Sequence, residues 1–368
     1  MNMLLQILKW VVCPLAGLLL LGFLGLLLYR VYLEKSTEIE TPNGISSLEE
    51  IVLGGLRQWI FIRGTDRSNP VLLFLHGGPG APLLGMSSSR LHDAEVIEHF
   101  TVVHWDQRGA GKSFSSDIPV DSMTFDRLVE DCNELIDYLR SRLQTRKVFV
   151  VAHSGGTIIG LRAAYRYPEK IHAYVGVAQV VNDYEQQRIS YDFVVEEAEK
   201  SGDVGRQNAI KAIGPPPYDS PKKGMAKERL VGQYGGFMHD SSIRQTMKMT
   251  SLLISFLTSP EYSLSEGIRA FRNLGFEFTM NAMWEEMKNV DLAEEIQSVK
   301  VPIYFFEGKY DMNVPTVLVE EFYDSLDAEK GKKLIIFEHS GHMPMIEEKE
   351  KYQDSLINVV LKESHNRS

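Results

Sequence analysis

The sequence has little cysteine and no concentrated positive charge. It contains two cysteines, Cys13 in an apolar stretch and Cys132 in a helical pattern, among 368 residues. Two cysteines placed in this way build no disulfide framework. The net charge is −10, and no cluster of Lys and Arg supplies the cationic face that a nucleic-acid-binding protein needs. We therefore expect a globular chain without disulfides and without a nucleic-acid partner.

Motifs for metals and nucleotides are also missing. No group of His, Cys, Asp and Glu has the spacing of a metal site. The run GAGKS at positions 109–113 resembles the end of a phosphate-binding loop, but the first glycine of that motif would fall at position 106, which is Asp. We therefore expect no metal and no other cofactor.

A long apolar run is present near the N-terminus. Residues 10–29 carry no charge, and twenty helical residues at about 1.5 Å each cross a hydrocarbon layer of roughly 30 Å. Trp10 and Tyr29 stand at its ends, where aromatic side chains favour the membrane interface. The alternative is a cleaved signal peptide, but this run is longer than an ordinary signal core and no small-x-small cleavage site follows it. We predict a retained single-pass anchor over residues 1–33 and a polar tether over residues 34–44.

The orientation of this anchor depends on the flanking charges. Lys9 and the amino group precede the span, and Arg30 and Lys35 follow it, so the positive-inside comparison is nearly balanced. We expect a cytoplasmic N-terminus and an extracytoplasmic catalytic domain.

Beyond the tether, apolar strands alternate with helices. Residues 45–63 form two apolar runs around Gly54 and Gly55, which predicts a hairpin. Continuous apolar runs, typical of strands buried on both faces, follow at 71–75, 101–105, 148–151, 173–177, 301–306 and 333–337. Helical patterns separate them, and the last runs from 345 to 361. We predict an α/β fold with a mostly parallel sheet covered on both faces, built from residues 45–181 and 300–365.

Residues 182–299 differ from the flanking segments. They are helical and rich in Met, are broken at 214–217 and at Gly235, and contain no convincing strand. An insertion of this kind forms a cap over the carboxyl edge of the sheet, where ligands bind in α/β folds.

A nucleophile is predicted at Ser154. The run VFVVAHSGGT at 148–157 indicates a strand, a sharp turn and a helix, a turn that exposes a serine hydroxyl when the residues two before and two after it are small. Ala152 and Gly156 occupy these positions. The run HGGPG at 76–80 follows a buried strand, and we expect the N–H groups of Gly78 and Gly155 to form an oxyanion hole.

The remaining members of a catalytic triad are found late in the chain. A serine nucleophile needs a histidine base and a carboxylate that orients it. Asp311 and His342 each follow a predicted strand, in the order Ser, Asp, His that this kind of fold uses. His339 is a competitor, but it lies closer to its strand than His342 does.

With these residues in place, the chain resembles the prolyl aminopeptidase (proline iminopeptidase) family of α/β-hydrolases over residues 45–365. The most specific marks are HGGPG at 76–80 and DQRGAGKS at 106–113. The nucleophile segment differs, because Ala152 and His153 stand where the family usually has two glycines. The resemblance implies a helical cap and release of an N-terminal residue, often proline, from short peptides. It also implies that acidic cap residues hold the substrate amine, with Glu185, Glu277 and Glu285 as counterparts.

An aminopeptidase acting on peptides is therefore the leading hypothesis. A membrane-anchored esterase, lipase-like enzyme or amide hydrolase acting on acyl substrates is the alternative, because of the anchor and the Met-rich cap. A non-catalytic binding module on the same fold is a further alternative, although such proteins usually lose part of the triad. The oligomeric state has no signature in the sequence.

Overall fold

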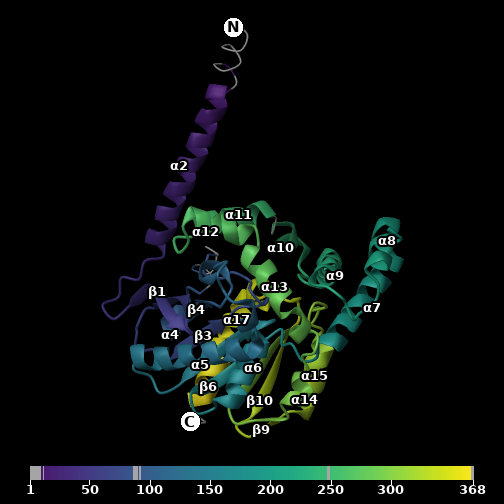
Figure 1. The fold of residues 1–368 in the computed structure, drawn as a ribbon. Helices are drawn as coiled ribbons and strands as arrows, with labels where there is room; N and C mark the ends of the chain where they lie inside the picture. The colour runs from purple at the N-terminus through teal and green to yellow at the C-terminus, as the bar shows by residue number, and fades with distance from the viewer. Residues whose placement is uncertain (1–9, 11, 86–89, 91–92, 247–248, 366–368) are drawn as a thin grey trace.

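The protein is organised around one eight-stranded sheet (Figure 1). The computed structural model describes residues 10, 12–85, 90, 93–246 and 249–365. The strand order is β1-β2-β4-β3-β5-β6-β8-β10; β1 and β2 are antiparallel to their neighbours, and the strands from β4 to β10 run parallel. The strands are β1 (Ile45–Leu53), β2 (Leu56–Gly64), β3 (Val71–Leu75), β4 (Thr101–Asp106), β5 (Val148–His153), β6 (Ile171–Val177), β8 (Ile303–Gly308) and β10 (Lys332–Phe337). The predicted hairpin and mostly parallel sheet are confirmed.

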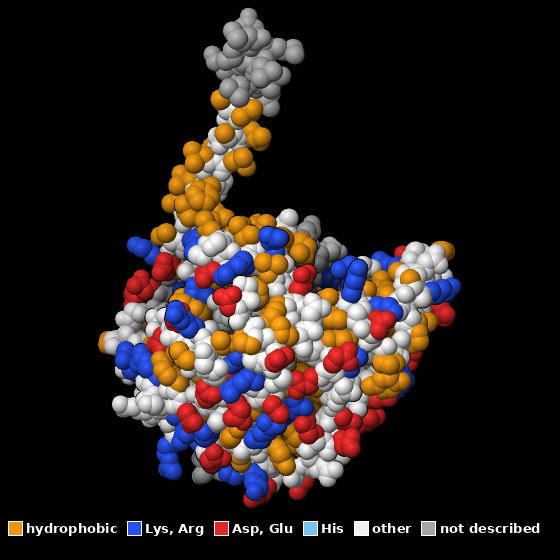
Figure 2. Space-filling model, viewed as in Figure 1, with side chains coloured by type: hydrophobic (Ala, Val, Ile, Leu, Met, Phe, Trp, Pro, Cys, Tyr) orange, Lys and Arg blue, Asp and Glu red, His pale blue; other side chains and the backbone are white. Residues whose placement is uncertain are grey.

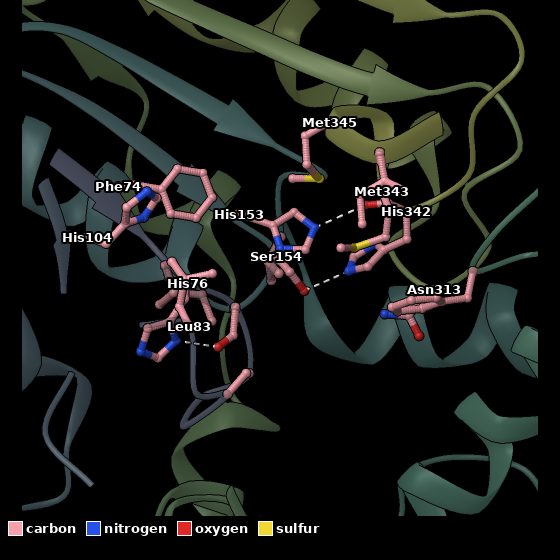
Figure 3. Close-up of a pocket in the computed structure, with 18 of the residues that line it drawn as sticks. Phe74, His76, Leu83, His104, His153, Ser154, Asn313, His342, Met343 and Met345 are labelled. Carbon is pink, nitrogen blue, oxygen red and sulfur yellow. Dashed lines mark hydrogen bonds between the residues drawn. The ribbon is translucent and has the colours of Figure 1, made fainter. Parts of the chain in front are cut away.

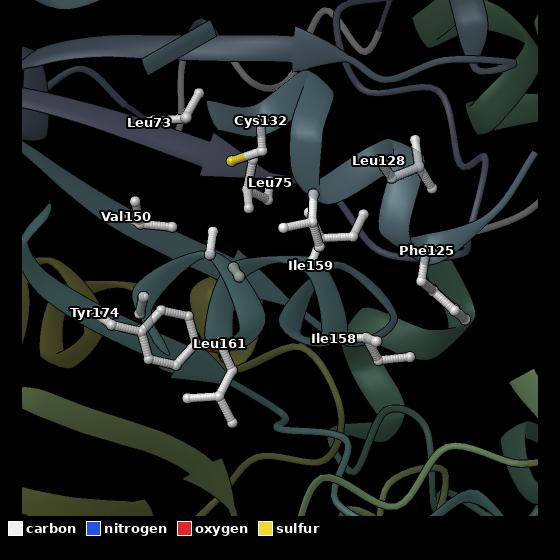
Figure 4. Close-up of a cluster of buried hydrophobic side chains, with 14 of the residues drawn as sticks. Leu73, Leu75, Phe125, Leu128, Cys132, Val150, Ile158, Ile159, Leu161 and Tyr174 are labelled. Carbon is white, nitrogen blue, oxygen red and sulfur yellow. The ribbon is translucent and has the colours of Figure 1, made fainter. Parts of the chain in front are cut away.

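Helices cover both faces of this sheet. On one face, α5 (Phe125–Arg142) and α6 (Gly156–Arg166) bury the main apolar cluster, which includes Leu73, Val150 and Cys132 (Figure 4). Burial raises the pKa of the Cys132 thiol to about 12, so this side chain acts as a small apolar group. On the other face, α4 (Val96–His99) and α17 (Lys349–Asp354) pack against a second cluster.

The cap is helical, as predicted, and lies over one edge of the sheet (Figure 1). An isolated bridge joins Asn182 to Asp291, so the chain leaves and re-enters the core at neighbouring points. The cap helices are α7 (Asp183–Ser201), α8 (Val204–Ile213), α9 (Pro221–Gln233), α10 (Ser241–Thr246), α11 (Met249–Thr258), α12 (Leu264–Phe271) and α13 (Leu274–Met287).

The end of the chain differs from the sequence prediction. After α14 (Leu292–Glu295), residues 298–299 form a short strand, β7, which pairs with β9 (Asp327–Ala328), although no strand was expected within residues 182–299. The helix α15 (Thr316–Ser325) follows β8 as predicted. The single helix expected over 345–361 is instead α16 (Pro344–Glu347), α17, a π-helical segment (Ser355–Leu361) and α18 (Lys362–His365). Glu348, with φ −127° and ψ 56°, separates α16 from α17, whereas α17, the π-helical segment and α18 follow one another without a break.

The N-terminal helix α2 runs from Cys13 to Ser36 and projects from the domain on the cap side (Figure 1). It is long and apolar enough to cross a membrane. It ends at Ser36, so the first residues of the predicted tether are helical. Residues 1–9 and Val11 of the predicted anchor lie outside the described residues.

Candidate active site

Ser154 lies at the sharp turn between β5 and α6. Its φ of 54° is in the left-handed region, a strained conformation that holds the hydroxyl away from both elements. The turn requires glycine on its helix side, because a Cβ on Gly155 would come within 2.1 Å of the carbonyl oxygen of Gly78. The close approach of β5, α6 and the loop after β3 therefore fixes the position of the Ser154 hydroxyl.

His342 and Asp311 reach this hydroxyl from two later loops. The Nε2 atom of His342 lies 2.9 Å from Ser154 Oγ (Figure 3), and its Nδ1 lies 2.7 Å from Asp311 Oδ2. The other carboxylate oxygen of Asp311 accepts hydrogen bonds of 2.8 Å from the amides of Asn313 and Val314. With Nδ1 protonated toward Asp311, Nε2 presents its lone pair to the Ser154 hydroxyl, which is the arrangement needed to remove a proton.

A second histidine, His153, supports the ring of His342. Its Nε2–H donates to the carbonyl oxygen of His342 at 3.0 Å, and the two rings lie 4.8 Å apart. Burial lowers the pKa of His153 to about 3, with a smaller contribution from His342, so the ring stays neutral. Sequence reasoning gave His153 no role, although a polar residue directly before the nucleophile was visible.

The predicted oxyanion donors lie side by side. Gly78 has φ 117°. Its carbonyl oxygen would lie 2.1 Å from a Cβ added to Gly155, so the Gly78 peptide packs closely against Gly155. Within the described part of the chain, the N–H groups of Gly78 and Gly155 have no hydrogen-bond acceptor. Two unpaired amides beside a serine hydroxyl can bind a developing oxyanion.

The motif at 106–113 holds this loop in place. The carboxylate of Asp106 accepts hydrogen bonds from the amides of Leu83, Leu84 and Lys112 at 2.8 to 3.1 Å. Arg108 forms a buried ion pair with Asp131 through bonds of 2.7 and 3.1 Å. The motif therefore joins the oxyanion loop to the sheet and to α5, and we assign it a structural role.

Ser154 opens into a cavity of about 440 Å³ between the sheet edge and the cap. The cap wall contains Asp183 of α7 and Glu228 of α9, together with Gln186 and Gln187. Burial raises the pKa of Asp183 to about 6, and a hydrogen bond from Gln187 and the nearby Lys227 oppose that shift. Desolvation likewise lowers the pKa of Lys227, which is fully buried. The cap wall is thus acidic, and the apolar side chains of Phe237, Phe276, Met280 and Met287 also line it.

The three carboxylates suggested by the resemblance lie elsewhere. Glu185 pairs with Arg188 at 2.8 Å, Glu285 pairs with Lys288 at 2.8 Å, and Glu277 is exposed. None of them is part of the pocket lining. The sequence did carry a signal for cap residues that line the pocket. Polar side chains at 183, 186, 187 and 190 recur with helical spacing, and they form part of the buried face of α7.

Among the described residues, no group of three or more His, Cys, Asp or Glu side chains is placed to hold a metal ion.

Comparison with known proteins agrees with this geometry. Residues 70–205 match the model of the alpha/beta hydrolase fold family. The probable aminopeptidase YbaC of Bacillus subtilis is 32% identical over 319 residues, covering 86% of this chain and 97% of that protein. The crystal structure of a proline iminopeptidase from Mycobacterium smegmatis superposes with a TM-score of 0.61 at 14% identity, over 88% of this chain and 100% of that one. A membrane phospholipase A has a TM-score of 0.64 at 18% identity and covers 100% of both chains, which shows a shared fold. The chain belongs to the proline iminopeptidase-like family of α/β-hydrolases.

Proposed function

We propose that the protein is a serine aminopeptidase that releases N-terminal residues from short peptides. The observation that carries this proposal is the hydrogen-bonded series Ser154, His342 and Asp311 opening into a pocket with an acidic cap wall. The name of the Bacillus subtilis relative, a probable aminopeptidase, agrees with it.

The proposed mechanism passes through an acyl-enzyme. Ser154 Oγ attacks the carbonyl carbon of the substrate while His342 takes the hydroxyl proton, and the amides of Gly78 and Gly155 stabilise the oxyanion. The imidazolium then gives its proton to the departing amine. Water, activated by the same imidazole, hydrolyses the ester on Ser154 and releases the amino acid.

The acidic cap wall supplies the aminopeptidase specificity in this proposal. A free α-amino group is cationic near neutral pH, and Asp183 and Glu228 offer it carboxylates within the same cavity as Ser154. A charged hydrogen bond in a buried site contributes more than one in water. A substrate with a blocked, neutral amine cannot donate a charged hydrogen bond to these carboxylates.

A substrate panel tests the proposal. The full-length protein in lipid nanodiscs would be assayed with prolyl-, alanyl- and leucyl-arylamides, the same arylamides with acetylated amines, and short acyl esters. We expect cleavage of the free-amine arylamides and at least tenfold slower cleavage of the acetylated ones. Equal cleavage of both forms, or cleavage of esters alone, contradicts an aminopeptidase and favours the esterase alternative.

Replacing Asp183 with Asn should improve stability while weakening substrate binding. The folded-state pKa of about 6 lies above the ordinary 3.8, so ionised Asp183 destabilises the fold. The penalty is absent below pH 3.8, grows as the pH rises to 6 and is complete above it. At pH 8 the Asp183→Asn variant should therefore gain up to about 3 kcal/mol in free energy of unfolding, and its kcat/KM for free-amine arylamides should fall about 10- to 100-fold.

The control for this change is Glu185→Gln on the same helix, outside the pocket, which should alter neither quantity. In the wild type, KM for free-amine substrates should rise as the pH falls below 6, because Asp183 loses its charge, and Asp183→Asn should remove this dependence. A variant that is no more stable at pH 8 and binds free amines normally would show that Asp183 has no such role.

We further propose that α2 is retained as the membrane anchor. The guanidinium of Arg30 donates to the carbonyl oxygens of Leu257 and Tyr262 at 3.1 and 2.7 Å, so the base of α2 is bonded to the cap. Apolar side chains of the cap, among them Met249 and Ile254, are exposed beside it, and Figure 2 shows hydrophobic side chains covering α2 and the adjoining surface. This continuous apolar surface would face the bilayer that holds the helix.

After a carbonate wash, we expect the protein to remain in the membrane fraction and to have the mass of the full-length chain. Protease added to intact cells should digest the catalytic domain, since we propose that it lies outside the cytoplasm. Recovery of a soluble chain that begins after the apolar run would instead show that the run is a cleaved signal peptide. Protection of the catalytic domain from the added protease would show the opposite membrane orientation.

A further inference from the structure

We propose that the catalytic pocket continues past Ser154 into an apolar chamber that binds an unbranched alkyl chain of an amphipathic substrate. This inference rests on the proposed serine hydrolysis and adds a substrate class to it. The chamber is defined here by the pocket-lining residues on the α4 and α17 face of the sheet: Leu72, Phe74, Val96, Val102, His104, Tyr352 and Leu356.

Strand pairing builds one wall of the chamber. Leu72 pairs with Val102, and Phe74 pairs with His104, across the parallel strands β3 and β4. Because side chains alternate along a strand, these four point to the same face of the sheet. That face is opposite the one covered by α5 and α6, yet its side chains line the same cavity as Ser154. The cavity therefore passes around the carboxyl ends of the strands.

Helices form the other wall. Val96 of α4, Tyr352 of α17 and Leu356 of the π-helical segment line the cavity and are 4%, 7% and 2% exposed. In Figure 3, Phe74 and His104 lie on one side of Ser154, while His342 and Asn313 lie on the other. A substrate whose reacting carbonyl is at Ser154 can thus extend in two directions, toward the cap or into the chamber.

The chemistry of the chamber selects an apolar group. His104 directs its Nε2 to the carboxylate of Asp93, so these two polar side chains are paired with each other. Lys349 and Gln353 also line the cavity, and the unpaired Nδ1 of His104 lies in a wall whose other side chains are aliphatic and aromatic. A charged or strongly polar group would lose its hydration there without replacement, whereas an alkyl chain gains from burial.

A cavity of about 440 Å³ is much larger than the voids of packed protein interiors, few of which exceed a water molecule, so it has the size of a binding site. The cap wall carries the carboxylates of Asp183 and Glu228 beside apolar side chains such as Met280, whereas the side chains beyond Ser154 are mainly apolar. An amphipathic molecule matches both ends. The proposed anchor α2 keeps the domain at a bilayer, where molecules with alkyl chains collect.

The reaction balances as a hydrolysis. Ser154 displaces an alcohol or amine from an ester or amide, His342 protonates that leaving group, and water then releases the carboxylic acid. The alkyl chain belongs either to the acyl group or to the leaving group, and two substrate series separate these cases. One series is p-nitrophenyl esters with acyl chains of increasing length, and the other is alanine N-alkylamides with increasing alkyl length.

The test measures kcat/KM for both series on the full-length protein in nanodiscs, with chains short enough to stay monomeric. In one series we expect a rise of about three- to fourfold for each added methylene until the chamber is filled. Val96→Phe narrows the chamber and should lower the ratio of long-chain to short-chain kcat/KM at least tenfold. Val317→Phe, on the exposed surface of α15, is the control and should leave the ratio unchanged.

A flat dependence on chain length in both series, or an unchanged ratio in folded Val96→Phe, would overturn the proposal. If Val96→Phe does not fold, Val96→Ala replaces it and should move the optimum to longer chains; an unmoved optimum also overturns the proposal. Failure of the chamber leaves hydrolysis of short substrates intact. Failure of the proposed function instead appears as equal cleavage of free-amine and acetylated arylamides, or as cleavage of esters alone, whatever the chain-length dependence, so the two outcomes are distinguishable.

Discussion

Replacing Ser154 with alanine should lower kcat by about 10⁴- to 10⁶-fold while the fold stays intact. The hydroxyl lies 2.9 Å from His342 Nε2, and without it no acyl-enzyme can form. Alanine has the same Cβ as serine, so the strained turn at φ 54° is no more strained than before. Turnover would be measured with the arylamide that the panel identifies as the best substrate.

Two further readouts separate loss of the nucleophile from loss of structure. A fluorophosphonate probe should label the wild type and not Ser154→Ala, and the melting temperatures of the two should agree within a few degrees. Ser116→Ala, in an exposed loop, should keep both labelling and turnover. Near wild-type turnover in Ser154→Ala would refute the nucleophile assignment, and absence of both labelling and turnover in the wild type would favour the non-catalytic alternative.

The parts of the fold that were predictable are those set by local sequence. Continuous apolar runs identified the buried strands, and the strand, turn and helix around Ser154 can be recognised from a few adjacent residues. Asp311 and His342 were found because each follows a strand and parallel strands end at one edge of a sheet. The structure brings these side chains within hydrogen-bonding distance of one another.

In the cap, the pocket-lining residues differ from the carboxylates that the sequence suggested. Asp183 and Glu185 are two residues apart on α7, and on a helix with 3.6 residues per turn they point about 200° apart. One therefore lines the pocket and the other pairs with Arg188 at the surface. Which face of α7 turns inward depends on its packing against the core and the rest of the cap, and composition does not encode that choice. The apolar chamber was missed for a similar reason, because it is formed by strands and helices that are far apart in the sequence.

The second large effect is expected at His342. His342→Ala should lower kcat by about 10⁴- to 10⁶-fold, because no other described side chain hydrogen-bonds to the Ser154 hydroxyl. The double variant Ser154→Ala/His342→Ala should be no slower than either single variant, since members of one triad act as a unit and their effects do not add. Steady-state turnover of the three variants, compared with the same arylamide, provides the measurement.

His339 supplies the matched control, since it is three residues away and was the competing base in the sequence. Its side chain is exposed, and its amide donates to Glu348 at 2.8 Å, a bond that survives replacement of the ring. His339→Ala should therefore retain turnover within about twofold. The reverse result, loss of activity in His339→Ala with retention in His342→Ala, would move the general base to the other histidine. An additive loss in the double variant would mean that Ser154 and His342 act in separate steps, and the acyl-enzyme mechanism would have to be abandoned.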